Sequence, residues 1–257
     1  MIRLLLTKFK NILLLLIIGA MVLTTISTVH AEDYFHYKVI PASATENIQQ
    51  RQCEVIIRAG EYRGKAGKRI YINNQNVKLP SDIPVRNDND GKGFYVSEWD
   101  INVKESLALV KKLRAMGIDA KLQAATTKAE DLNAAGRLAN KSNPYLYISI
   151  HHNYYDSNST GYFAMYNPNN TQSKELAERL SNAIRDNSKV PQRENRANDG
   201  YIGELNVINN TTTPALLELG FFSNLEELEH ICSDSYVDYI STRLAKEIRI
   251  ILNDNYR

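Results

Sequence analysis

Short apolar runs alternate along the chain with amphipathic segments. The runs are rich in β-branched and aromatic residues and are bounded by Gly, Pro or Asn, so they predict buried strands. They lie at residues 54–58, 118–122, 145–150 and 214–221. Apolar residues that recur near helical spacing predict helices at residues 97–116 and 128–141 between these runs. Strands that alternate with helices indicate a single α/β domain, with a mainly parallel or mixed central sheet and helices on both faces.

Weaker patterns complete the expected order of elements. Further strands are expected at residues 69–73, 161–166 and 204–208, and further helices at residues 171–185, 224–231 and 236–252. Ser97 is a plausible N-cap of the first long helix, and Gly117 is a natural residue to end it. Residues 80–93 and 190–203 lack a periodic pattern and are expected to be loops.

The first 31 residues form a separate unit. Arg3, Lys8 and Lys10 precede an apolar run at residues 12–23, and residues 29–31 resemble a cleavage site. This pattern predicts a secretory signal peptide; an uncleaved membrane anchor is the alternative, although the run is shorter than the ~20 residues that a spanning helix needs. Residues 32–52 are expected to form an arm, and residues 53–257 the catalytic domain. The mature protein is therefore expected to be secreted, extracellular or associated with the cell wall, without stable membrane association.

The charge balance argues against one class of partner. The chain has 31 Lys+Arg and 29 Asp+Glu residues, and loss of the basic leader leaves it nearly neutral. We therefore expect no nucleic-acid partner. Cys53 and Cys232 are the only cysteines. In an oxidising compartment they either form a disulfide or remain two buried thiols, and the sequence does not decide between these alternatives.

Three residues are candidates for chemistry. His151 follows the apolar run 145–150, and open α/β sheets place their chemistry at the carboxyl ends of such strands; a simple hydrogen bond to the backbone is the alternative. Glu218 interrupts an apolar strand, so it is hydrogen-bonded, bound to a metal or held at a raised pKa, unless its face of the strand reaches solvent. Glu98 opens the long helix, where the helix dipole alone favours an acid.

Together with the Gly60-Glu61 turn, these residues form a set of nitrogen and oxygen ligands. Such a set suits a Zn²⁺ site with an open position, where a bound water becomes a nucleophile and a nearby carboxylate moves its proton.

The local sequence around these residues resembles that of the zinc-dependent N-acetylmuramoyl-L-alanine amidases of the cell-wall amidase type. That family opens a helix with Glu-x-x-x-Asn, ends one strand with Ser-Ile-His-x-Asn and carries Leu-x-Glu-x-Gly-Phe-x-Ser-Asn on another. The matching residues here are Glu98, Asn102, Ser149, Ile150, His151, Asn153, Leu216, Glu218, Gly220, Phe221, Ser223 and Asn224. Residues 137–140 and Gly161 also resemble the family, and the similarity covers roughly residue 54 to the C-terminus.

The resemblance implies a peptidoglycan hydrolase that cleaves the amide bond between N-acetylmuramic acid and the L-alanine of the stem peptide. It selects His151 over His152 as a metal ligand, and it makes Glu218 the catalytic acid-base group. An activating protein partner is not identified by the sequence.

One departure concerns the first zinc histidine of the family, because this chain has Glu61 at that position. A carboxylate can bind zinc, so the expected metal ligands are Glu61, Glu98 and His151. The second anionic oxygen would raise the pKa of a bound water and favour a harder divalent ion such as Mn²⁺.

Two other functions compete with amide hydrolysis. A catalytically weakened wall-binding or regulatory protein on the same fold would explain the changed ligand. A secreted zinc carboxypeptidase would explain the expected metal ligands and the acidic Glu218, but not the sequences of the motifs. Tyr154, Tyr155, Asn158 and Tyr162 follow the site and are expected to line a saccharide-peptide groove, with ordinary loop packing as the alternative.

Overall fold

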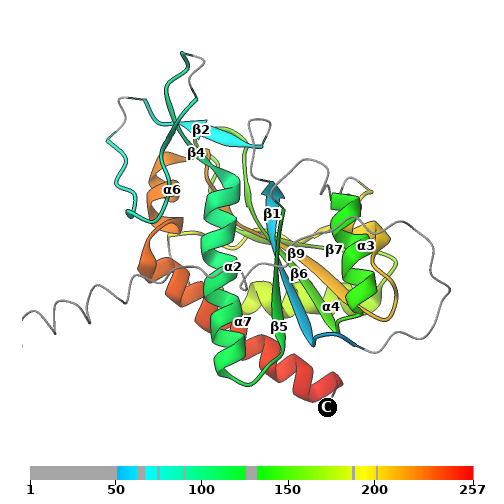
Figure 1. Cartoon of the computed structure of the whole chain (residues 1–257). Coiled ribbons are helices and arrows are strands. Elements are labelled where there is room, and N and C mark those ends of the chain that lie inside the picture. The colour runs from blue at the N-terminus through cyan, green and yellow to red at the C-terminus, as the bar shows by residue number, and fades with distance from the viewer. Residues whose placement is uncertain are drawn as a thin grey trace, which may run out of the picture. The chain divides into compact units, whose positions relative to one another are not determined.

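The computed structural model of the chain describes residues 51–62, 67–73, 76–88, 91–125, 132–186, 189–200 and 202–256. The predicted signal peptide and nearly all of the predicted arm lie outside these residues. The strands of the large sheet, in spatial order, are β5 (Ala120–Ala125), β1 (Val55–Tyr62), β6 (Leu146–Asn153), β9 (Thr213–Phe221), β7 (Phe163–Tyr166) and β8 (Arg196–Ala197) (Figure 1). A small sheet has the order β2 (Arg69–Tyr71), β4 (Phe94–Ser97) and β3 (Arg86–Asn87).

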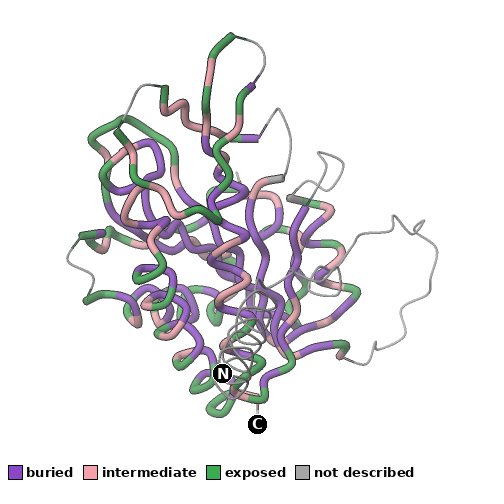
Figure 2. The backbone as a smooth tube through the Cα atoms, turned by 60° about the vertical axis from the view of Figure 1, so that its left-hand side comes forward, coloured by how far each residue is buried: buried purple, intermediate pink, exposed green. Residues whose placement is uncertain are grey.

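The helices are α2 (Glu98–Ala115), α3 (Leu132–Ser142), α4 (Thr171–Ala183), α5 (Gly203–Val207), α6 (Leu225–Ile231) and α7 (Asp234–Asn255). In the large sheet β5, β1, β6 and β9 are parallel, whereas β7 is antiparallel to β9. The predicted α/β fold with a mainly parallel or mixed sheet is therefore confirmed. The strands β6 and β9 are buried at almost every position (Figure 2), as their continuous apolar runs predict.

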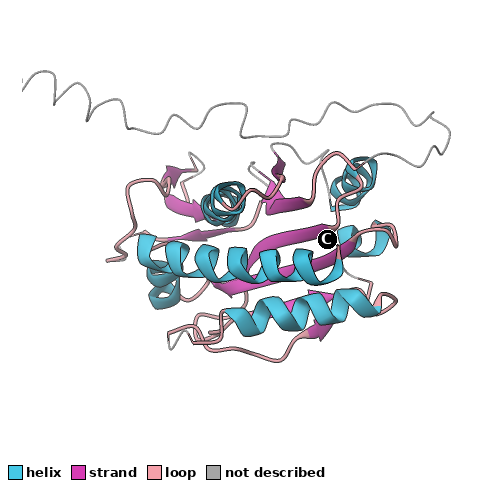
Figure 3. Ribbon diagram, turned by 90° about the horizontal axis from the view of Figure 1, so that it is seen from below, coloured by secondary structure: helices cyan, strands magenta, loops and turns pink. Residues whose placement is uncertain are grey.

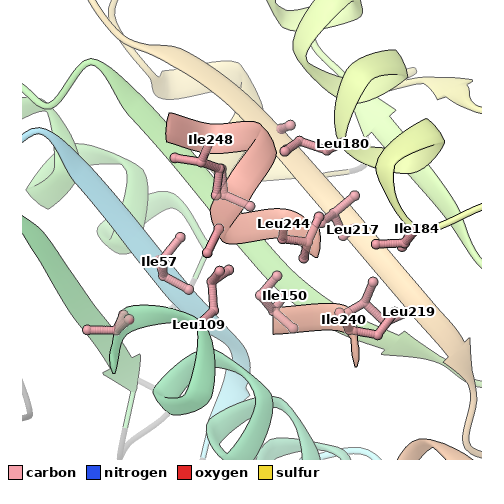
Figure 4. Packing of buried hydrophobic residues seen from close by; sticks show 14 of the residues in the cluster. Ile57, Leu109, Ile150, Leu180, Ile184, Leu217, Leu219, Ile240, Leu244 and Ile248 are labelled. Atoms are coloured by element: carbon pink, nitrogen blue, oxygen red, sulfur yellow. The ribbon is translucent and has the colours of Figure 1, made fainter. Parts of the chain in front are cut away.

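Helices cover both faces of the large sheet, as predicted. On one face, alternate strand residues such as Ile57, Ile150 and Leu217 share a buried cluster with Leu109 of α2 and Leu244 of α7 (Figure 4). The helices α4 and α7 also contact each other on this face (Figure 3).

On the opposite face, Ile56 of β1 and Tyr147 of β6 pack with Ala139 of α3 and with Ile208, which follows α5. The period of two along each strand separates these two clusters.

The helix α2 ends as the sequence predicts. Ser97 occupies the N-cap position, although its side chain makes no capping hydrogen bond. Gly117 follows the C-cap Met116 with φ of 79°, a left-handed conformation that glycine adopts readily.

Four predicted segments differ from the structure. The strand β1 continues to Tyr62, so Gly60 and Glu61 belong to the strand end and not to a turn. Residues 204–208 do not form a strand, because α5 occupies this segment and turns Glu204 and Leu205 together toward the interior. Residues 80–93 contain the short strand β3, which pairs with β4 in the small sheet, and its polar residues carry little apolar signal. Residues 190–203 contain the two-residue strand β8, which pairs with β7.

The two cysteines do not form a disulfide. Cys53 and Cys232 are buried free thiols in different hydrophobic clusters, so the pairing alternative is wrong and the alternative of two buried thiols is correct. Burial raises the pKa of the Cys53 thiol to about 11, so this thiol remains protonated at neutral pH. Among the described residues, none of the helices combines the length and apolar composition needed to cross a bilayer.

Candidate functional site

The candidate site lies at the carboxyl ends of three neighbouring parallel strands. In the register of the sheet, Ala59 of β1 pairs with Ile150 of β6, and the next residue of β6, His151, pairs with Glu218 of β9. Glu61 lies near the end of β1, and Glu98 is the first residue of α2. The parallel register therefore places residues from distant parts of the chain at one edge of the sheet.

Glu61, Glu98 and His151 come together at this edge. Each offers one ligand atom, and these atoms all lie within 4.8 Å of one another. Glu98 and His151 are buried and Glu61 is half-buried. Ligand atoms bound about 2.1 Å from a tetrahedral ion lie roughly 3.4 Å apart, so a contraction of at most about 1.4 Å would suit the group to one ion.

Glu98 is held by one oxygen. Its Oε1 accepts hydrogen bonds from the His152 backbone N–H over 3.2 Å and from Asn102 Nδ2 over 3.1 Å, and it lies 3.2 Å from His151 Nδ1. Among the described residues, its buried Oε2 has no hydrogen-bond partner. Burial opposes ionisation of Glu98, but the His151 ring outweighs it and lowers the pKa of this carboxyl. Within the described residues, the Oε2 atom is therefore an ionised oxygen without a hydrogen bond, 3.8 Å from Lys68 Nζ.

The ring of His151 lies directly on the backbone of Gly60. A Cβ atom at Gly60 would lie 2.3 Å from His151 Nε2, so the close approach requires glycine. Burial opposes protonation of the ring, but the Glu204 and Glu98 carboxylates outweigh it and raise the pKa of His151 to about 10. In the absence of a metal ion, the ring is thus a cation held between carboxylates.

The neighbouring histidine faces elsewhere. His152 Nδ1 lies 2.8 Å from Asn102 Oδ1, and its Nε2 lies 3.5 Å from Glu105 Oε1. His152 is fully buried and does not belong to the group of three ligand atoms.

Glu218 is buried beside His151. Only 9% of the residue is exposed, so the alternative of a solvent-facing strand residue is wrong. Burial raises the pKa of Glu218 to about 7, against the opposing effect of His151. Its Oε2 has no hydrogen-bond partner within the part of the chain that the structure describes. The carboxyl group can therefore exchange a proton near neutral pH.

Lys68 is a site residue that the sequence reasoning missed. Its Nζ lies 3.6 Å from Glu61 Oε1 and 3.8 Å from Glu98 Oε2, and its side chain is about half exposed. Glu61 has a φ of 59°, in the left-handed region that non-glycine residues seldom adopt. Such strain is found where the surrounding structure fixes the backbone, often at functional sites. The changed ligand position thus has both an unusual backbone and a nearby cation.

A buried ion pair lies on the α5 side of His151 and was also missed. Arg58 Nη1 lies 3.0 Å from Glu204 Oε2, and both side chains are almost completely buried. The Tyr147 hydroxyl donates to the same Glu204 oxygen over 3.2 Å. Burial opposes ionisation of Glu204, but Arg58 and His151 outweigh it and lower the pKa to about 2. No sequence signal marked this pair, because Arg58 belonged to a strand and residues 204–208 were assigned to the wrong element.

The charges of the site have a simple balance. The carboxylates of Glu61, Glu98, Glu204 and Glu218 surround the His151 ring, and two cations, Arg58 and Lys68, accompany them. With every carboxylate ionised and the imidazole neutral, these groups leave two negative charges, which one divalent cation would neutralise.

The residues of the expected groove divide into two sets. Tyr154, Tyr155 and Asn158 are exposed after β6. Tyr162 is only 1% exposed and donates its hydroxyl to the Ser181 carbonyl oxygen, so its assignment to the groove is wrong. Tyr162 also forms an isolated parallel bridge with Gln192.

The fold and the site define a class of protein: an α/β domain in which side chains able to bind a metal lie together at the C-terminal ends of the parallel strands. The buried Glu218 lies beside them. A family model described as N-acetylmuramoyl-L-alanine amidase matches residues 87–249, and the chain belongs to this family, Amidase_3. Family membership supports a cell-wall amidase.

A curated relative is the germination-specific N-acetylmuramoyl-L-alanine amidase of Bacillus subtilis, 31% identical over 123 residues. The alignment covers 47% of this chain and 50% of the relative, so the match spans about half the length of that protein.

Solved structures share the fold. An N-acetylmuramoyl-L-alanine amidase from Clostridium difficile 630 has a TM-score of 0.59 and 21% identity, over 81% of this chain and 100% of that one. The catalytic domain of CwlV from Bacillus (Paenibacillus) polymyxa var. colistinus has a TM-score of 0.61 and 17% identity, over 78% and 98% of the two chains. The CwlD amidase from Clostridioides difficile, solved in complex with the GerS lipoprotein, has a TM-score of 0.58 and 21% identity, over 79% and 100%.

Proposed function

We propose that this protein is a metal-dependent peptidoglycan hydrolase that cleaves the amide bond between N-acetylmuramic acid and the L-alanine of the stem peptide. Family membership supports the choice of bond. One observation supports metal dependence: the ligand atoms of Glu61, Glu98 and His151 lie within 4.8 Å of one another, and the buried Glu218 pairs with His151 in the sheet.

The residues present fit a divalent ion. A buried Glu98 oxygen has no hydrogen-bond partner among the described residues, and the surrounding charges leave two negative charges to neutralise. One imidazole nitrogen and two carboxylate oxygens are ligands that Zn²⁺ accepts. The two anionic oxygens also suit a harder divalent ion.

In this proposal Glu61, Glu98 and His151 hold the ion, and Glu218 moves the proton. A bound divalent ion would activate water near neutral pH and polarise the amide carbonyl. Glu218 accepts the proton of the attacking water at Oε2, where it has no hydrogen-bond partner among the described residues, and passes it to the leaving amine. Asn102 keeps Glu98 Oε1 in place by donating to it, and Oε2 is left without a hydrogen-bond partner among the described residues.

Location and partners form part of the same proposal. The leader pattern supports secretion to the cell wall, where the substrate is found. The solved complex of CwlD with the GerS lipoprotein supports a search for a protein partner. The exposed Tyr154 and Tyr155 lie next to the site and offer aromatic surfaces for a saccharide-peptide chain.

The test is metal analysis of the purified protein combined with an assay for L-alanine amino groups released from purified peptidoglycan. We expect about one divalent ion per chain and release of amino groups that a chelator abolishes and added Zn²⁺ restores. Metal-free protein that releases amino groups at the same rate would refute the metal dependence.

The second candidate function is a wall-binding or regulatory protein without hydrolysis. It is favoured by one observation: the Lys68 ammonium already contacts Glu61 and Glu98, the two carboxylates that would hold the ion. Peptidoglycan binding without release of amino groups, with and without added Zn²⁺ or Mn²⁺, would select this function over hydrolysis.

A further inference from the structure

Two buried polar atoms face each other behind the proposed metal ligands. His151 Nε2 lies 3.8 Å from Glu204 Oε1, and within the described residues neither atom has a hydrogen-bond partner. The side chain of Glu204 is fully buried, and that of His151 is 6% exposed. Because unpaired buried polar atoms are costly, two such atoms at this distance require an explanation.

Glu204 is held in this position by its other oxygen. Oε2 is 3.0 Å from Arg58 Nη1 and accepts the Tyr147 hydroxyl. Arg58 lies on β1 two residues before Gly60, and Tyr147 lies on β6 four residues before His151. The two strands that carry Glu61 and His151 therefore also fix Glu204, and they leave Oε1 directed at the ring.

Two carboxylates compete for the ring proton of a neutral His151. Glu98 Oε1 lies 3.2 Å from Nδ1, and Glu204 Oε1 lies on the Nε2 side. If the proton stays on Nδ1, that nitrogen cannot bind an ion and remains paired with Glu98. If the proton is on Nε2, the lone pair of Nδ1 faces the carboxylates of the cluster.

We infer that Glu204 is a positioning residue that accepts the Nε2–H of His151 and thereby selects the tautomer in which Nδ1 can bind a divalent ion. A movement of roughly 0.8 Å brings the two atoms to hydrogen-bond distance. Metal-binding histidines usually donate their second N–H to a carboxylate or carbonyl group, which fixes the ring. This inference rests on the proposed function, because it gives Glu204 a role only if His151 binds an ion.

The adjacent histidine supplies a matched control. Glu105 is 3% exposed and its Oε1 lies 3.5 Å from His152 Nε2, so a second buried carboxylate faces a second buried ring. His152 is outside the group of three ligand atoms. The Glu204→Gln and Glu105→Gln substitutions therefore make the same isosteric change at two buried carboxyl groups that each face a histidine ring, but only Glu204 faces a proposed ligand.

The experiment measures Zn²⁺ affinity by competition with a chromogenic chelator, without substrate, and the tautomer of His151 by ¹⁵N NMR of the zinc-loaded protein. We expect Glu204→Gln to weaken Zn²⁺ binding about 10- to 100-fold and to shift the Nε2 resonance. Glu105→Gln should keep the wild-type affinity. Wild-type affinity in folded Glu204→Gln would overturn the inference, as would equal weakening in both variants.

A second variant covers the case in which Glu204→Gln fails to fold because Arg58 keeps its charge. The double variant Arg58→Met/Glu204→Gln removes both charges of the buried pair, a change that is often neutral for folding. It should show the same weakened Zn²⁺ affinity, and wild-type affinity in it would overturn the inference. If the wild-type protein itself binds no divalent ion, the proposed function fails; if it binds one and the Glu204 variants bind it equally well, only this inference fails.

Discussion

Replacing Gly60 with alanine tests the proposed position of His151 without changing a ligand. The new Cβ would lie 2.3 Å from Nε2 and 2.4 Å from Cδ2 and Cε1 of the ring. Non-bonded heavy atoms normally approach to about 3.5 Å, so the ring must withdraw by roughly 1 Å. Gly60 is not among the residues with positive φ, so the backbone tolerates alanine and the effect is steric.

A displacement of this size has two measurable consequences. Misplacing a catalytic group by about 1 Å lowers turnover by about 10²-fold. Crowding a packed interior also costs about 1–3 kcal/mol of the free energy of unfolding. We therefore expect Gly60→Ala to fold with reduced stability, to bind metal more weakly and to release amino groups from peptidoglycan about 10²-fold more slowly.

The control separates stability from site geometry. Gly117 has a φ of 79° and open space where a Cβ would lie, so Gly117→Ala costs about 1–2 kcal/mol through backbone strain alone. This variant should lose a similar amount of stability and keep wild-type metal content and turnover. If Gly60→Ala matches the Gly117 variant in metal content and turnover, the ring does not need its place on Gly60 and the reasoning is refuted.

Five further substitutions, at four residues, test the assigned roles. His151→Ala should lose metal and activity, whereas His152→Ala should keep its metal because that ring faces Asn102; equal metal loss in both would contradict the assignment. Glu218→Gln should keep metal content near normal and lower kcat by roughly 10²-fold or more, and an unchanged kcat would exclude it as the proton-transfer group. Glu61→Ala should weaken metal binding and Glu61→His should tighten Zn²⁺ and raise activity, measured by chelator competition and amino-group release; if Glu61→Ala changes neither property, Glu61 is not a ligand.

The sequence predicted the features of the fold that depend on local pattern. The apolar runs that became β6 and β9 and the helical spacing of α2 were sufficient to place His151, Glu218 and Glu98 on the correct elements. Because parallel strands end at the same edge, these placements also predicted that the side chains would meet. The local signals failed at residues 204–208, where a short segment with few apolar residues fits a strand or a helix equally well.

The missed contacts join residues that are far apart in the chain. The pair of Arg58 and Glu204 forms only when α5 packs on the opposite face of the sheet from α2, and no spacing in the sequence reports that contact. Lys68 directly precedes β2, so the position of its side chain near Glu61 depends on the pairing of β2 with β4, which local sequence does not report. Tyr162 was grouped with the exposed residues that follow the site, whereas it is buried and its hydroxyl donates to the Ser181 carbonyl oxygen.

The parallel register of the central strands also constrains how the protein folds. The strands β1, β6 and β9 pair with one another although they lie far apart in the sequence. The chain must therefore lose the entropy of closing long loops before these pairings can form. Domains dominated by such non-local pairing fold on a time scale of about milliseconds to seconds. Because Glu61, His151 and Glu218 meet only when the three strands are in register, the candidate site is absent from any partly folded chain in which one of these strands is unpaired. If the protein binds a divalent ion as proposed, metal uptake followed during refolding would therefore report the moment at which all three strands have paired.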